Sequence, residues 1–180
     1  MLVLKCVFHY LHGTITLGFI FRETGDLHMY SNSNWVSNTI NHHSITGYIS
    51  YFGSAPIFWS SWKQPTVALS TIEAEYMALA KATCEAIWLW KLSSELGIHT
   101  NFPITIFIDN QSAMYFTENS VFHICSKHIN ICHHFVCECL AFNEVILNHC
   151  ASEKNIADMF TKPLAKPQSI ALCDHILGIV

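Results

Sequence analysis

The chain has 180 residues, of which 51% are hydrophobic and 12% are charged. This length and apolar content predict one globular domain with a core of its own. Nine lysines and arginines against 13 aspartates and glutamates give a formal net charge of −4, which argues against the basic surface that tight nucleic-acid binding requires.

The eight cysteines lack the compact spacing of a small disulfide scaffold, so we expect reduced thiols in an intracellular protein. Residues 1–21 are rather apolar, but Lys5, His9 and His12 interrupt them and no small-residue cleavage site follows. Neither a signal peptide nor a membrane-spanning helix is therefore expected.

The first part of the chain predicts three strands. Runs rich in β-branched and aromatic residues lie at 27–35, 47–52 and 56–62. Because the segments between them are too short for a crossover helix, the three strands are expected to form an antiparallel meander.

A long helix is predicted from Ser70 to Leu96. Ser70 and Glu73 fit a capping box, in which the hydroxyl accepts from the backbone of Glu73 and the carboxylate reaches back. Gly97 suits the left-handed position that follows a helix end.

The second part of the chain alternates strands and helices. The apolar run 104–108 predicts a strand buried on both faces, with Asp109 at its C-terminal end. Further elements are expected as a helix from about 110–112, a helix over 126–140, a strand over 144–148 and a short helix over 152–160, which Pro163 and Pro167 stop. The order predicts an α/β domain with helices packed on a mixed sheet.

Three carboxylates, Glu75, Asp109 and Asp158, lie at a strand end or in a helix start, which are rigid positions. Converging carboxylates suit phosphodiester hydrolysis by two Mg²⁺ ions about 4 Å apart. Glu73 and Glu75 point to different sides of their helix, so the capping role of Glu73 leaves Glu75 as the candidate ligand. Taken singly, Asp109 is equally explained as a helix cap, and Glu75 and Asp158 as solvated surface acids.

Six ordered blocks of sequence cover nearly the whole chain. They lie at 10–14, 44–48, 60–80, 109–113, 127–130 and 157–164. Together they resemble the ribonuclease H (RNase H) domain at the end of the Pol polyprotein of copia-type retrotransposons. The resemblance implies an RNase H-like fold, with a five-stranded mixed sheet flanked by helices. It also implies cleavage of the RNA strand of RNA:DNA hybrids during reverse transcription, with Mg²⁺ held by four acidic residues.

The resemblance gives catalytic and metal-binding roles to Glu75, Asp109 and Asp158. The fourth and central acid of the family lies in the motif Tyr-Ser-Asp-Ala-Asp-Trp, where this chain has asparagine at Asn32 and again at Asn34. A neutral amide cannot supply negative charge between two divalent ions. We therefore expect weakened Mg²⁺ binding and nuclease activity that is weak or lost.

A second departure from the family concerns basic residues. Where the family commonly has them, this chain has His42, His43, Trp62, Trp90, Cys132 and Cys137. Changes from arginine to these residues, like Asp→Asn, each need one transition in the coding DNA, which indicates mutational decay of a silenced element. The loss of phosphate contacts predicts weak hybrid binding. The alternative is a domesticated, non-catalytic copy with another role.

The resemblance also suggests an organisation for the chain. Residues 1–24 would be a remnant of the connection to the reverse transcriptase, 25–165 the RNase H-like domain and 166–180 a C-terminal tail, within a longer Pol product. The expected partners are an RNA:DNA hybrid, bound weakly, and the reverse transcriptase segment of the same polyprotein, but no membrane. The expected location is the cytoplasm, a virus-like particle or the nucleus.

The segment 123–139 offers a different interpretation, as a zinc-binding module. Cys125, His128 and Cys132 are spaced i, i+3 and i+7, on one helical face, and zinc accepts such ligands. Zinc modules usually place ligand pairs on turns, and Cys137 and Cys139 break the face. The RNase H interpretation is preferred, and one tightly held zinc ion per chain would favour the alternative.

Overall fold

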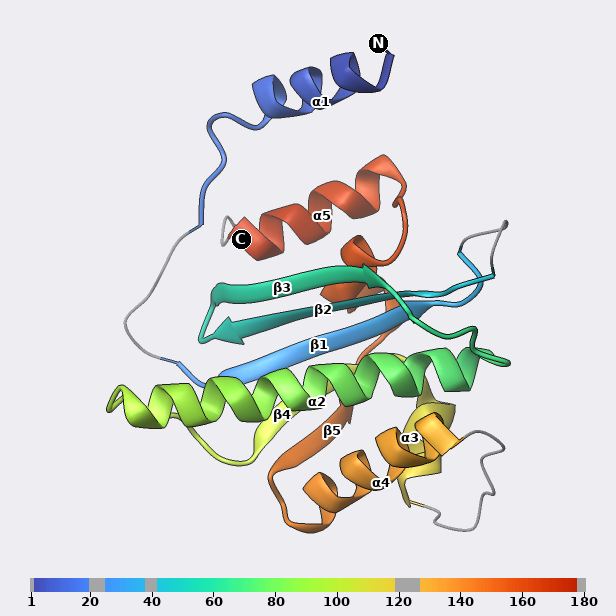
Figure 1. The fold of residues 1–180 in the computed structure, drawn as a ribbon. Helices are drawn as coiled ribbons and strands as arrows, with labels where there is room; N and C mark the ends of the chain where they lie inside the picture. Colours follow the sequence, from blue (N-terminus) through green and yellow to red (C-terminus); the bar gives the residue numbers. More distant parts are fainter. Residues whose placement is uncertain (1, 20–24, 38–41, 119–126, 178–180) are drawn as a thin grey trace.

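A computed structural model describes residues 2–19, 25–37, 42–118 and 127–177 of the chain (Figure 1). Its centre is a five-stranded sheet in the order β3-β2-β1-β4-β5. The strands are β1 (Leu27–Asn34), β2 (Ile45–Phe52), β3 (Ala55–Lys63), β4 (Ile104–Ile108) and β5 (Val145–His149). β1 to β3 pair antiparallel, whereas β4 is parallel to β1 and to β5. The predicted mixed sheet, with its antiparallel meander, is confirmed.

Helices cover both faces of this sheet (Figure 1). One face carries α2 (Thr71–Glu95) and α4 (Lys127–Ala141), with α3 (Gln111–Glu118) beside them. The opposite face carries the 3₁₀ helix η2 (Ile156–Phe160) and α5 (Lys166–Leu177), and η1 (Ser152–Lys154) precedes η2. The first helix, α1 (Leu2–Gly13), lies apart from the sheet.

The larger core lies between the sheet and the helices α2 and α4. Met29, Ile106 and Val136 contribute side chains with no exposed surface. α2 approaches β1 through a stripe of fully buried alanines at four-residue spacing, namely Ala74, Ala78, Ala82 and Ala86. Because these side chains are small, the helix backbone lies close to the sheet, and this places the start of α2 above the end of β1.

The smaller core lies on the opposite face. Ile49, Tyr51, Ile156 and Leu172 form it, and Leu172 comes from α5. The segment expected as a C-terminal tail is therefore largely helical and contributes to the core. Pro167 is the second residue of α5, in the first helical turn, where the missing N–H leaves no helical hydrogen bond unmade.

Local details refine the predicted helices. Ser70 caps α2 by accepting from the Glu73 N–H at 3.2 Å, and Gly97 follows the helix end at φ +72°. The Glu73 carboxylate accepts from the N–H of Leu69, one residue before the cap. The short helix expected over 152–160 consists of two 3₁₀ turns separated by Asn155. Within the described ranges, no helix has the length and apolar character needed to cross a membrane.

Candidate active site

Two of the predicted acids, Glu75 and Asp109, lie with Asn32 at one edge of the sheet. β1 and β4 run parallel as neighbours, so their C-terminal ends meet at this edge. Asn32 lies near the end of β1, and Asp109 directly follows β4. The first turns of α2 bring Glu75 to the same edge, where these three residues line one cavity.

The start of α2 is attached to the sheet by Gln64, which follows β3. The Gln64 side chain has no exposed surface and donates to the Thr46 hydroxyl at 3.0 Å and to the Ala74 carbonyl at 2.9 Å. These two bonds join β2 to the residue directly before Glu75. The carboxylate is thus placed by a buried hydrogen-bonded side chain as well as by the alanine stripe.

Asp158 reaches the site through η2, which is fixed to the sheet at three points. The buried amide of Asn155 donates to the Ser31 carbonyl at 3.0 Å, and the Ser61 hydroxyl donates to the Phe160 carbonyl at 2.5 Å. Between these points η2 lies against Gly47 of β2, where a Cβ atom would come within 2.8 Å of the Ala157 carbonyl oxygen. Glycine is required there because η2 approaches the strand so closely.

The cavity at this edge has a volume of about 610 Å³ and is open to solvent. Its lining includes Asn32, Glu75, Asp109, His149 and Lys162. Asp158 does not belong to the lining, because its side chain is only 2% exposed. Among the predicted acids, Glu75 and Asp109 therefore share the cavity, whereas Asp158 lies behind it.

Both oxygens of the Asp158 carboxylate have partners. The Asn32 amide donates to Oδ1, and the Lys162 ammonium lies 2.9 Å from Oδ2. Asn32 is itself buried, at 3% exposure. Asparagine thus acts as a hydrogen-bond donor at the position where the resembling family has a carboxylate, and an ionised aspartate could not make this bond.

Burial shifts the pKa values of Glu75 and Asp158. It raises the pKa of Glu75 to about 8, with a further contribution from the nearby charge of Asp109, while hydrogen bonding from Ser33 opposes the shift. Burial also raises the pKa of Asp158, and the hydrogen bond and charge of Lys162 act against this rise. Near neutral pH the site is therefore less negative than its three carboxyl groups suggest.

Two of the alternatives left open by the sequence are answered by these contacts. Asn110, not Asp109, caps α3, since its side-chain oxygen accepts from the Ala113 N–H at 3.1 Å. Asp158 is buried, so it is not a solvated surface acid. Glu75 is half-buried and lines the cavity.

Lys162 and His149 are site residues that sequence reasoning missed. A signal for Lys162 was present, because it follows Asp158 by four residues within the same block, a spacing that brings side chains together on a helical turn. His149 is the last residue of β5, a strand end at the same edge as Asp109. No pattern in the sequence distinguishes it from the other eleven histidines.

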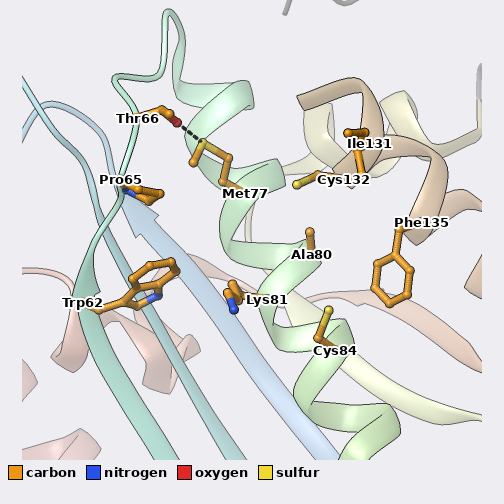
Figure 2. Close-up of a pocket in the computed structure, with 10 residues that line it drawn as sticks. All are labelled: Trp62, Pro65, Thr66, Met77, Ala80, Lys81, Cys84, Ile131, Cys132 and Phe135. Atoms are coloured by element: carbon orange, nitrogen blue, oxygen red, sulfur yellow. Dashed lines mark hydrogen bonds between the residues drawn. The ribbon is translucent and has the colours of Figure 1, made fainter. Parts of the chain in front are cut away.

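A second, apolar pocket of about 360 Å³ lies between the end of β3, α2 and α4 (Figure 2). Trp62, Met77 and Phe135 contribute to its walls, and Lys81 lies with its ammonium 5.4 Å from the Trp62 ring centroid. Its lining residues carry no carboxylate. The pocket therefore lacks the acidic ligands that phosphodiester hydrolysis by metal ions needs.

The predicted zinc ligand Cys132 lines this apolar pocket. Burial raises the pKa of its thiol, which disfavours the thiolate that zinc binds. Cys125 and the side chain of His128 lie outside the described residues. In the part of the chain that the structure describes, no three His, Cys, Asp or Glu side chains form a metal-ligand cluster.

Comparison with known proteins relates the chain to retrotransposon polyproteins. It is 39% identical over 165 residues to the retrovirus-related Pol polyprotein from transposon RE2 of Arabidopsis thaliana, covering 91% of this chain and 11% of that protein. It is 32% identical over 176 residues to the Pol polyprotein from transposon TNT 1-94 of Nicotiana tabacum, covering 97% of this chain and 13% of that protein. The chain thus spans about a tenth of the length of these relatives. No protein-family model matches it.

Solved structures identify the fold. The structure of LC11-RNase H1 in complex with an RNA/DNA hybrid superposes with a TM-score of 0.55 at 14% identity, covering 76% of this chain and 94% of that chain. The N-terminal RNase H domain of rv2228c from Mycobacterium tuberculosis superposes with a TM-score of 0.56 at 10% identity, covering 87% of this chain and all of that chain. The chain is therefore a homologue of copia-type retrotransposon Pol polyproteins and has the ribonuclease H fold.

Proposed function

We propose that this protein descends from the RNase H domain of a retrotransposon Pol polyprotein and that its ability to cleave the RNA strand of RNA:DNA hybrids is strongly reduced or lost. The observation that carries this proposal is the contact between Asn32 and Asp158. A neutral donor occupies the position of the central acid, and it is hydrogen-bonded to the carboxylate that would share the metal site.

The donor set supports weak metal binding at most. Glu75 and Asp109 line the cavity and can offer carboxylate oxygens to one hard divalent cation such as Mg²⁺. Two ions would need further negative charge. Asn32 is neutral and does not supply it, and the charge of Asp158 is already paired with that of Lys162. A bound Mg²⁺ ion would act as a Lewis acid on a phosphodiester oxygen. The described residues therefore offer two carboxylates to one ion at most and do not fit a two-ion site.

Hybrid binding is proposed to be weak. The fold is that of LC11-RNase H1, which has been solved with an RNA/DNA hybrid, and the open cavity at the sheet edge is the surface that a hybrid would approach. The net charge of −4 opposes this association, because binding to a phosphate backbone depends on basic side chains.

We further propose that residues 25–165 act as the RNase H-like unit and that residues 1–24 derive from the connection to a reverse transcriptase segment, which would be a partner within one polyprotein. α1, in that first segment, exposes large apolar side chains such as Val3, Phe8 and Tyr10, which is consistent with a missing neighbour. Such a protein would act in the cytoplasm, in a virus-like particle or in the nucleus.

The test is a cleavage assay on a hybrid labelled in its RNA strand, with Mg²⁺ and separately with Mn²⁺. The unmodified chain is expected to give little or no product, and Asn32→Asp is expected to gain activity. Robust cleavage by the unmodified chain that is abolished by Glu75→Gln, Asp109→Asn and Asp158→Asn would overturn the proposal. If the chain binds an RNA:DNA hybrid no better than it binds duplex DNA, the proposed binding of hybrids is wrong.

A further inference from the structure

Lys162 and the carboxylate of Asp158 form an ion pair within one turn of the chain. The two side chains are four residues apart, and the turn between them is closed by backbone bonds from Thr161 and Lys162 to the Asp158 carbonyl, at 3.1 and 3.2 Å. This turn directs the lysine back over the aspartate, where the ammonium lies 2.9 Å from Oδ2. Within the described ranges this is the one ion pair between side chains.

Lys162 also belongs to the cavity. Its side chain is 42% exposed and lines the same space as Glu75 and Asp109, while the side chain of its partner is 2% exposed. Asn32 lines the cavity too and binds the other oxygen of Asp158. A cation that enters from solvent therefore meets Asn32 and Lys162 before it can reach Asp158.

Through these contacts both oxygens of the Asp158 carboxylate have partners without a metal ion. A buried carboxylate is stabilised when both oxygens have partners and one of those partners is charged. An acid at position 32 would instead face Asp158 as a like charge and would favour binding of a cation between them. Because Asn32 is neutral, this repulsion is absent, and Lys162 is the cation that pairs with the Asp158 carboxylate.

We propose that Lys162 is the resident counter-ion of Asp158 and that it competes with divalent metal ions for this carboxylate. The proposal rests on the proposed function for the location of the metal site, and it adds the residue that keeps Asp158 from binding metal. A divalent ion that binds Asp158 must displace the ammonium, because two cations cannot share the same oxygen at 2.9 Å without strong repulsion.

The test measures binding of Mn²⁺ alone, without nucleic acid, from the electron paramagnetic resonance signal of the free ion at pH 7.5. Lys162→Gln removes the charge and is expected to tighten Mn²⁺ binding at least tenfold, roughly the repulsion between a dication and an ammonium 5 Å apart in a water-like dielectric. Lys162→Arg keeps the charge and is expected to bind as weakly as the unmodified chain. Lys166→Gln, which removes an exposed lysine on α5, is the matched control.

Loss of the Lys162 charge also leaves the Asp158 carboxylate without its counter-ion, so the variant is expected to be less stable. Its melting temperature is therefore measured with and without Mn²⁺, and Mn²⁺ is expected to raise it more than it raises that of the unmodified chain. If Lys162→Gln is unfolded without metal, Mn²⁺ is expected to restore its folded circular dichroism spectrum.

Equal Mn²⁺ affinity in Lys162→Gln and Lys166→Gln would overturn the proposal, as would an unfolded Lys162→Gln protein that Mn²⁺ does not rescue. The outcome is separable from that of the proposed function. Tightened Mn²⁺ binding in Lys162→Gln, together with robust hybrid cleavage by the unmodified chain, would contradict the proposed function and leave the role of Lys162 intact.

Discussion

Replacing Asn32 with aspartate changes one buried contact and tests how the site is balanced. In the unmodified protein the Asn32 amide donates to Asp158, and Lys162 holds the other oxygen. The substitution removes the donor and places a second carboxyl group at the same oxygen, inside a site where Asn32 is 3% exposed. Without a metal ion, one of the two acids must take up a proton or the pair must move apart.

The expected cost follows from these contacts. A hydrogen bond to a charged group contributes about 1.5–3 kcal/mol, and the like-charge repulsion that replaces it is limited by protonation of the pair. We therefore expect the free energy of unfolding to fall by about 3 kcal/mol at pH 7.5 in the presence of EDTA. For a protein of this size that corresponds to a melting temperature lower by roughly 6–12 °C.

The measurement is thermal unfolding of both proteins in EDTA and in Mg²⁺. Mg²⁺ is expected to return most of the lost stability to Asn32→Asp and to change the unmodified protein little, because only the variant gains a carboxylate pair that needs a cation. Asn34→Asp is the matched control, since Asn34 lies on the same strand and makes only a long bond of 3.5 Å to the Thr161 carbonyl. An Asn32→Asp protein as stable as the unmodified chain in EDTA, and indifferent to Mg²⁺, would refute this reasoning.

Three further predictions concern groups that place or tune the site. The pKa of Glu75 rises from 4.5 to about 8 on folding, so its stabilising contribution is complete below pH 4.5 and is lost as pH rises to 8. At pH 8, Glu75→Gln is therefore expected to raise the free energy of unfolding by on the order of 2 kcal/mol, measured from melting curves at several pH values. Glu95→Gln, the control, is expected to bring no such gain. Gly47→Ala is expected to lower the free energy of unfolding in urea by about 1–3 kcal/mol, because the added Cβ atom would meet η2. If Gly47→Ala is as stable as the control Gly18→Ala, η2 does not lie against Gly47. Gln64→Ala removes the buried hydrogen bonds to the Thr46 hydroxyl and the Ala74 carbonyl and leaves a cavity, so we expect a loss of about 2–4 kcal/mol and faster hydrogen exchange in the first turns of α2. Unchanged exchange there would argue against the anchoring role of Gln64.

Much of the fold follows from local patterns in the sequence. The meander was predictable because its strands are short, β-rich and closely connected, and α2 because Ser70 and Gly97 mark its ends. α5 was not, because Pro163 and Pro167 indicate a stop, and only packing of Leu172 against the second face of the sheet shows that a new helix begins. The amphipathic pattern of α1 is similarly uninformative without a partner surface.

The site was predictable only in part. The resemblance located Asn32, Glu75, Asp109 and Asp158, and the structure brings all four to one sheet edge. Their exposure differs, because Glu75 and Asp109 line the cavity while Asp158 is buried behind Asn32. This difference depends on long-range contacts from η2 to three strands, such as that of Asn155 with Ser31, which no local pattern encodes.

We expect the neutral side chain at position 32 to limit catalysis by an otherwise intact RNase H fold. The most direct measurement is the single-turnover rate of RNA-strand cleavage in a hybrid, with saturating Mg²⁺, for the unmodified chain and Asn32→Asp prepared side by side. The variant is expected to cleave roughly 100-fold faster or more, equivalent to about 2.7 kcal/mol of barrier. Equal cleavage rates for the two proteins, whether both are active or both inactive, would refute a limiting role for Asn32.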